Sequence, residues 1–80
     1  MRMHYSQQVT ILVRSLGGQG TALRRAIESL KTNSVPDWAM PLPDRPGTYE
    51  WLVAGYWVMY EVDQSNPSET VIRIVNVKVN

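Results

Sequence analysis

The sequence predicts an α+β domain with a short N-terminal strand, a helical hairpin and then a three-stranded antiparallel meander. In the first half, apolar residues recur at the three- and four-residue spacing of a helix face. In the second half, apolar residues alternate within runs that turn residues separate. Because 80 residues can build only one hydrophobic core, we expect a single domain over residues 1–80.

The first helix is expected after a short strand at residues 3–5. Ser6 is a suitable N-cap, and Gly17-Gly18 is a suitable end and interhelical turn. The apolar positions also alternate in part, so a strand over residues 7–16 is the competing interpretation. The residues that share one helix face are Val9, Leu12, Val13 and Leu16.

A second helix is predicted with Thr21 as its N-cap and an end near Asn33, ahead of a proline-rich connector. The apolar stripe of this helix is Leu23, Ala26, Ile27 and Leu30. Four prolines in residues 36–46 exclude a regular helix there. We expect this connector to cross the core, with Trp38 and Leu42 as its anchors.

Three strands are predicted at about 48–53, 56–62 and 70–79, and the polar segment 63–69 forms the loop before the last one. Side chains alternate between the two faces of a strand, which assigns the faces of the first two. The face that meets the helices contains Trp51, Val53, Tyr56, Val58, Tyr60 and Val62. The opposite face contains Glu50, Leu52, Trp57, Met59 and Glu61.

This second face is predicted to bind a partner, because exposed apolar patches usually mark interfaces. The last strand supports the same interpretation, since residues 71–79 are apolar on both faces under strict alternation. The alternative is that the connector folds back and covers this face with Trp38.

Composition limits the classes of function. With no cysteine and a single histidine, His4, neither a disulfide framework nor a Cys- or His-rich metal site is available, and we expect no cofactor. No apolar run has the length of a membrane helix and nothing resembles a signal peptide, so a cytoplasmic protein is expected. Residues 1–40 carry five basic and two acidic residues, a net charge of +3, whereas residues 41–80 carry three basic and five acidic residues, a net charge of −2.

Three short motifs resemble the RelE/ParE toxin superfamily of bacterial toxin–antitoxin modules. They are Gly47-Thr48-Tyr49, Gly55-Tyr56 and Val58-Met59-Tyr60-Glu61-Val62-Asp63. In that family a helical hairpin is followed by a loop, an aromatic-basic strand, a Gly-Tyr-Arg-Val-x-Tyr-Glu-Val-like strand and an apolar strand. The resemblance therefore extends over nearly the whole chain.

The resemblance implies that the ribonuclease surface of the family is altered here. The family's basic positions match Glu50, Leu52 and Trp57, and a further basic residue falls near Lys78. Metal-free RNA cleavage needs cations at the phosphate, which these residues do not supply. The resemblance therefore implies a protein without ribonuclease activity, bound to an antitoxin-like segment or to a second copy of itself.

Two other functions remain open at this stage. An active ribosome-dependent mRNA interferase would draw its charges from Arg45, Arg73 and Lys78. A small nucleic-acid-binding module would use the basic helix residues Arg14, Arg24 and Arg25, although a solvated helix face is the commoner explanation for such charges.

Overall fold

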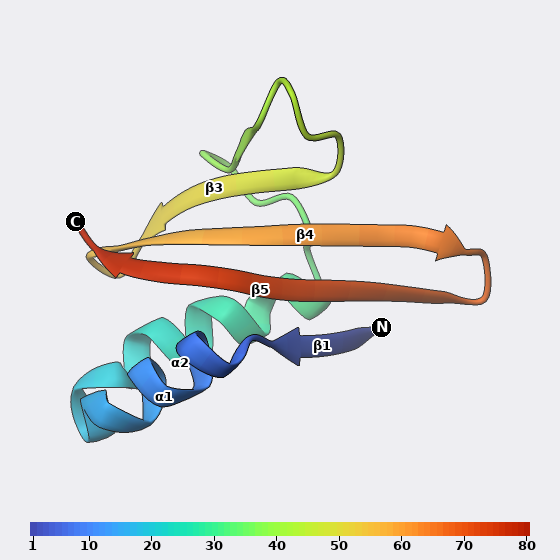
Figure 1. The fold of residues 1–80 in the computed structure, drawn as a ribbon. Helices are drawn as coiled ribbons and strands as arrows, with labels where there is room; N and C mark the ends of the chain where they lie inside the picture. The colour runs from blue at the N-terminus through green and yellow to red at the C-terminus, as the bar shows by residue number, and fades with distance from the viewer.

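The computed structural model describes residues 1–80 and has an α+β fold, in which a helical hairpin packs on one face of a five-stranded sheet (Figure 1). The elements in chain order are β1 (Arg2–Tyr5), α1 (Gln7–Leu16), α2 (Thr21–Glu28), β2 (Met40–Pro41), β3 (Thr48–Val53), β4 (Tyr56–Asn66) and β5 (Glu69–Val79). The predicted fold class and element order are therefore confirmed. The two-residue strand β2 was not predicted.

The strands lie in the order β1-β5-β4-β3-β2. β3, β4 and β5 form the predicted antiparallel meander, and β1 pairs in parallel with β5. A parallel pair requires a crossover connection, which the helical hairpin and the antiparallel strands supply here. The first strand therefore lies beside the first half of the last strand, where residues 2–5 pair with residues 71–74.

Local hydrogen bonds explain the bounds of α1. The Ser6 hydroxyl accepts from the Val9 amide at 3.3 Å, which confirms Ser6 as the N-cap. Gly17 adopts φ 55° and donates its N–H to the Arg14 carbonyl, so the predicted glycine stop is also confirmed. Residues 7–16 are helix, and the competing strand interpretation is wrong.

The start of α2 differs from the prediction. Residues Gly17–Gly20 form a 3₁₀ turn, and Thr21 is the first helical residue rather than the N-cap. The Thr21 hydroxyl donates back to the Gly18 carbonyl at 2.9 Å and so caps nothing in α2. The α-helix ends at Glu28, and a 3₁₀ turn at Ser29–Lys31 completes it slightly before the predicted end at Asn33.

One hydrophobic core lies between the helices and the sheet. Its buried members are Val9, Leu23, Ile27, Leu30, Trp51, Val58, Tyr60, Ile72, Ile74 and Val77. Tyr60 is fully buried, stacks on Tyr49 with ring centroids 5.4 Å apart and meets Trp51 edge-on. The predicted inner face of β3 and β4 is therefore confirmed.

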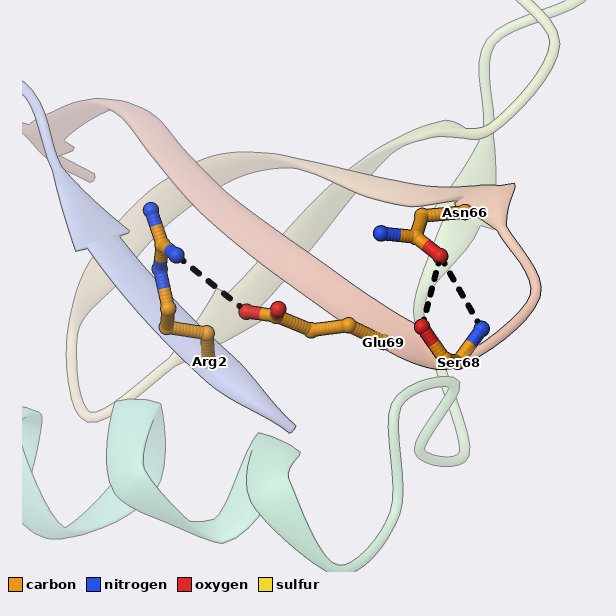
Figure 2. Close-up of polar contacts among 4 residues, drawn as sticks. All are labelled: Arg2, Asn66, Ser68 and Glu69. Atoms are coloured by element: carbon orange, nitrogen blue, oxygen red, sulfur yellow. Dashed lines mark hydrogen bonds and ion pairs between the residues drawn. The ribbon is translucent and has the colours of Figure 1, made fainter.

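The predicted loop at residues 63–69 is mostly strand, because β4 and β5 extend to a tight turn between Asn66 and Glu69. The Asn66 side-chain oxygen accepts from the Ser68 amide at 3.0 Å and from the Ser68 hydroxyl at 2.8 Å (Figure 2). The polar residues therefore do form a turn, but the turn is confined to the two residues between β4 and β5 at the tip of a long hairpin.

A β-bulge corrects the interpretation of β5 as apolar on both faces. Met59 pairs with Asn76 and Tyr60 pairs with Ile74, so Val75 is an extra residue on β5. Ile72, Ile74 and Val77 are consequently all buried, whereas Asn76 and Lys78 are exposed. Apart from Val71 and the bulged Val75, the apolar residues of this strand face the helices after the change of phase, and they give no support for a covering partner.

The connector does not cover the sheet in the way the alternative interpretation required. Trp38 is 87% exposed and is not an anchor, whereas Leu42 is half-buried. The Tyr60 hydroxyl, which donates to the Ser34 carbonyl at 2.8 Å, holds the start of the connector. Met40 and Pro41 then pair with β3 as an edge strand, so the connector lengthens the sheet sideways.

Candidate functional site

The face of the sheet opposite the helices is uncovered. Several residues of β3, β4 and β5 point away from the helices, and among them we define the outer face as Glu50, Leu52, Trp57, Met59, Glu61, Arg73, Asn76 and Lys78. Leu52 remains 42% exposed within it, and Met40 of the edge strand β2 remains 51% exposed beside it. The five residues predicted to bind a partner therefore lie together on one accessible surface.

Two cross-strand rows form the apolar part of this face. In one row Leu52 of β3 pairs with Trp57 of β4, which pairs with Lys78 of β5. In the next row Glu50 pairs with Met59, and Met59 pairs with Asn76. Directly opposed residues in a sheet have neighbouring side chains on the same face. The register therefore brings residues from all three strands into contact distance.

These rows surround a shallow hollow lined by Glu50, Trp57, Val58, Met59, Asn76 and Lys78. The indole N–H of Trp57 donates to the side-chain oxygen of Asn80 at 3.0 Å. The backbone N–H of Asn80 donates to the Gly55 carbonyl at 3.1 Å. These two bonds hold the indole in a fixed orientation at the wall of the hollow. A fixed aromatic side chain loses little conformational entropy when it binds a partner.

The charges at the hollow are unpaired. Glu50 and Lys78 both line it, but neither takes part in any of the three ion pairs of the chain. The remaining pair on this face joins Arg73 to Asp63 at 2.9 Å, towards the other end of the hairpin. Bonds from the Ser65 hydroxyl and amide, followed by the Arg73 pair, lower the pKa of Asp63 to about 2. The unsatisfied charges of both signs therefore lie beside the apolar rows.

The three cationic residues considered for RNA cleavage do not converge. Arg73 is engaged by Asp63, and Lys78 lies five positions further along β5, on the order of 15 Å away at ~3.3 Å per residue. Arg45 lies in the connector before β3, and its exposed side chain makes no ion pair. A phosphate in the hollow would meet Lys78 and the repelling carboxylate of Glu50.

The three basic helix residues differ in their contacts, because only the Arg24 side chain makes a hydrogen bond. Arg24 donates to the Gly17 carbonyl at 3.1 Å and lines a groove between α1 and α2 with Tyr5, Thr10, Val13 and Glu28. Arg14 and Arg25 are exposed on α1 and α2. One of the three guanidinium groups is therefore held by the backbone and shares its groove with an acidic residue, which weakens an electrostatic surface for nucleic acid.

The groove between the helices was not predicted, because its walls come from two helices and a strand. The Tyr5 hydroxyl donates to the Glu28 carboxylate at 3.1 Å, and Lys31 pairs with the same carboxylate at 2.9 Å. Burial, with this hydrogen bond and the Glu28 charge, raises the pKa of Tyr5 to about 12. The bonds from Lys31 and then Tyr5 lower the pKa of Glu28. The polar groups of the groove are thus satisfied by each other.

Asn76 and Met40 also belong to the accessible surface but were not among the predicted site residues. Strict alternation along β5 places Asn76 on the inner face, and only the bulge moves it to the outer face. Met40 lies among prolines, which give no strand signal, although it pairs with Glu50 at the edge of the face. No group of three or more His, Cys, Asp or Glu side chains gathers in a way that would hold a metal ion.

Comparison with protein-family models, with curated proteins and with solved structures finds no match for this chain. None of its helices has the length and apolar character required to span a bilayer.

Proposed function

We propose that this chain is a divergent, cytoplasmic member of the RelE/ParE toxin superfamily whose outer face binds protein and does not cleave RNA. The order of elements supports the proposal, since a helical hairpin precedes three antiparallel strands as in that family. The positions of the motifs behind the resemblance also support the proposal. Gly55 lies in the turn between β3 and β4, Tyr56 begins β4, and residues 58–63 form the centre of β4.

The observation that carries the proposal is the clustering of the family-matched positions. Glu50 and Leu52 of β3, Trp57 of β4 and Lys78 of β5 all belong to the outer face, in two adjacent rows. Where the family's ribonuclease branch has basic residues, this surface offers one carboxylate, two apolar side chains and one amine. It lacks the converging cations needed to stabilise a phosphorane.

The same residues suit protein binding. Trp and Met are enriched at the centres of interfaces, and burial of apolar surface contributes about 25 cal/mol per Å². Leu52, Trp57 and Met59 would form the apolar centre, with Glu50 and Glu61 towards its edge. The occupant would be an antitoxin-like protein segment, bound as a helix or an extended strand, or a second copy of this chain.

Expression in bacteria followed by mapping of mRNA 5′ ends tests the enzymatic side of the proposal. We expect no new cleavage sites in translated mRNA relative to an empty-vector control. Cleavage that disappears when Lys78 or Arg73 is replaced by alanine would contradict the proposal and would favour the interferase.

Co-purification with the product of the adjacent reading frame tests the binding side. Leu52→Glu and Trp57→Ala should abolish co-purification, because both remove apolar surface from the centre of the face. Ile11→Glu is the matched control, since Ile11 is 60% exposed on α1 and does not belong to the face. Equal retention of the adjacent gene product by Leu52→Glu and Ile11→Glu would refute the assignment of this face.

A further inference from the structure

We infer that the outer face takes a second copy of this chain and forms a two-fold symmetric dimer with β4 at its centre. This inference rests on the proposed function, because it names the occupant of the same face. A two-fold interface uses one patch twice, so the patch must be complementary to itself. The positions of Glu50 and Lys78 on the outer face meet that requirement in charge.

The charges are arranged on opposite sides of the central strand. Glu50 lies on β3 and Lys78 lies on β5, with β4 between them. A two-fold axis parallel to β4 and above the face places β3 of the second copy over β5 of the first. Glu50 of each copy then lies near Lys78 of the other, and two equivalent ion pairs form.

The offset along the strands is within the reach of these side chains. Glu50 shares a row with Met59, and Lys78 shares a row with Trp57, which is two residues away along β4. Two residues correspond to ~7 Å along a strand, a distance that the long lysine side chain spans. Within one chain the two groups make no ion pair, so neither is already compensated.

The apolar residues lie on or beside the axis in this arrangement. Trp57 and Met59 of the two copies meet at the centre, and Leu52 lies beside them. Trp57 is already fixed by its bond to Asn80, which lowers the entropy cost of association. Arg73 and Asp63, at the far end of the hairpin, satisfy each other. Glu61 also lies on β4 and would face Glu61 of the second copy across the axis, beside its cross-strand neighbour Arg73.

Charge of both signs favours a second copy over a partner with one sign of charge. A basic segment would pair with Glu50 and leave Lys78 uncompensated, and an acidic segment would do the reverse. The whole outer face covers three strands at ~4.8 Å spacing and about six residues along each strand, on the order of 300 Å². A typical stable interface buries ~800 Å² per partner, so we expect a weak dimer that forms only at high protein concentration.

Sedimentation velocity of the purified chain over a concentration series, at low and high salt, tests the dimer. The variants are Glu50→Lys and Lys78→Glu, with circular dichroism as the check that each remains folded. In either variant both inter-copy pairs become repulsive, so we expect dimerisation to weaken by about tenfold or more at low salt. The effect should shrink in 1 M salt, where the Debye length is ~3 Å.

Mixing the two variants provides the decisive measurement. Glu50→Lys presents two lysines and Lys78→Glu presents two glutamates, so both pairs become attractive in the mixed dimer. The double variant Glu50→Lys/Lys78→Glu should also regain the dimer for the same reason. Arg2→Glu is the control, because Arg2 pairs with Glu69 near the far end of β5 (Figure 2) and does not face the hollow.

Rescue in the mixture and in the double variant would support the symmetric dimer. A wild-type chain that stays monomeric at millimolar concentration, single variants that dimerise normally, or a mixture without rescue would each overturn it. None of these results would affect the broader proposal, which depends on the RNA-cleavage and co-purification assays. A monomeric chain that binds the adjacent gene product through Leu52 would refute only the identity of the partner.

Discussion

Tyr60→Phe tests the assignment of the Tyr60 hydroxyl as the anchor of the connector. The phenyl ring retains its stack on Tyr49 and its edge contact with Trp51, so the substitution removes one oxygen from a fully buried side chain. That oxygen donates to the Ser34 carbonyl at 2.8 Å. Burial, followed by the neighbouring Tyr49, raises the pKa of Tyr60 above its ordinary value, so the hydroxyl keeps its proton at neutral pH.

The expected loss follows from what the substitution leaves behind. The half-buried Ser34 carbonyl would lose its donor, and an unsatisfied buried group costs ~1–3 kcal/mol. For a domain of this size each kcal/mol lowers Tm by ~4–8 °C. We therefore expect the free energy of unfolding to fall by about 2 kcal/mol and Tm to fall by about 10 °C.

Urea denaturation and thermal circular dichroism measure both quantities. Tyr49→Phe is the matched control, because no hydrogen bond from the Tyr49 hydroxyl is present and the ring stack is kept. Trp38→Ala should also change stability by less than ~0.5 kcal/mol, since Trp38 is 87% exposed. Equal stability of Tyr60→Phe and Tyr49→Phe, or a large loss in Trp38→Ala, would refute this account of the connector.

Three further predictions concern turns and caps. Gly20→Ala should cost ~1–3 kcal/mol in urea denaturation, because an added Cβ comes to 3.0 Å from a side-chain carbon of α1. Gly18→Ala, with nothing within 4 Å, should be neutral or stabilising, and equal midpoints for the two would contradict the close approach. Because the pKa of Asp63 is lowered from 3.8 to about 2, its contribution to stability is complete above about pH 4 and is lost as the pH falls towards 2. Ser65→Ala should raise that pKa in an NMR carboxyl titration, and an unchanged value would refute the leading role of the hydroxyl. Ser6→Ala should lower the free energy of unfolding by ~1–2 kcal/mol. Ser6→Asp should also lower it, because aspartate keeps the cap acceptor of α1 but loses the hydroxyl that donates to β5. A fully stable Ser6→Asp would show that this donor is dispensable.

The parts of the fold that could be predicted depend on contacts close in sequence. The bounds of β3 match the expected range, because Gly47 and the Ala54-Gly55 turn mark its ends and its side chains alternate. The outer face followed from the same period of two, and the register confirms that Leu52 and Trp57 are neighbours. Ser6 and Gly17 marked the ends of α1 because caps act within one turn.

The parts that could not be predicted depend on contacts between distant segments. Trp38 is the largest apolar residue of the connector, which suggested an anchor, yet the buried hydroxyl of Tyr60 holds the connector through a backbone carbonyl. The pattern of side chains contains no information about which carbonyl meets that hydroxyl. The periodicity of the sequence likewise does not predict the parallel pairing of β1 with β5, because this pairing joins residues about 70 positions apart.

The bulge in β5 shows how such a distant contact determines the candidate site. Strict alternation from Ile72 and Ile74 would put Lys78 on the face that meets the helices. The extra residue Val75 changes the phase, so that Val77 is 6% exposed and Lys78 is exposed on the outer face opposite Trp57. A bulge leaves a residue outside the ladder, and here the Ser6 hydroxyl donates to the Val75 carbonyl at 3.0 Å. The junction between β1 and α1 therefore stabilises the phase of β5, and through it the side of the sheet on which the amine of the hollow lies. A residue far outside the outer face thereby helps to determine whether that face carries charges of both signs.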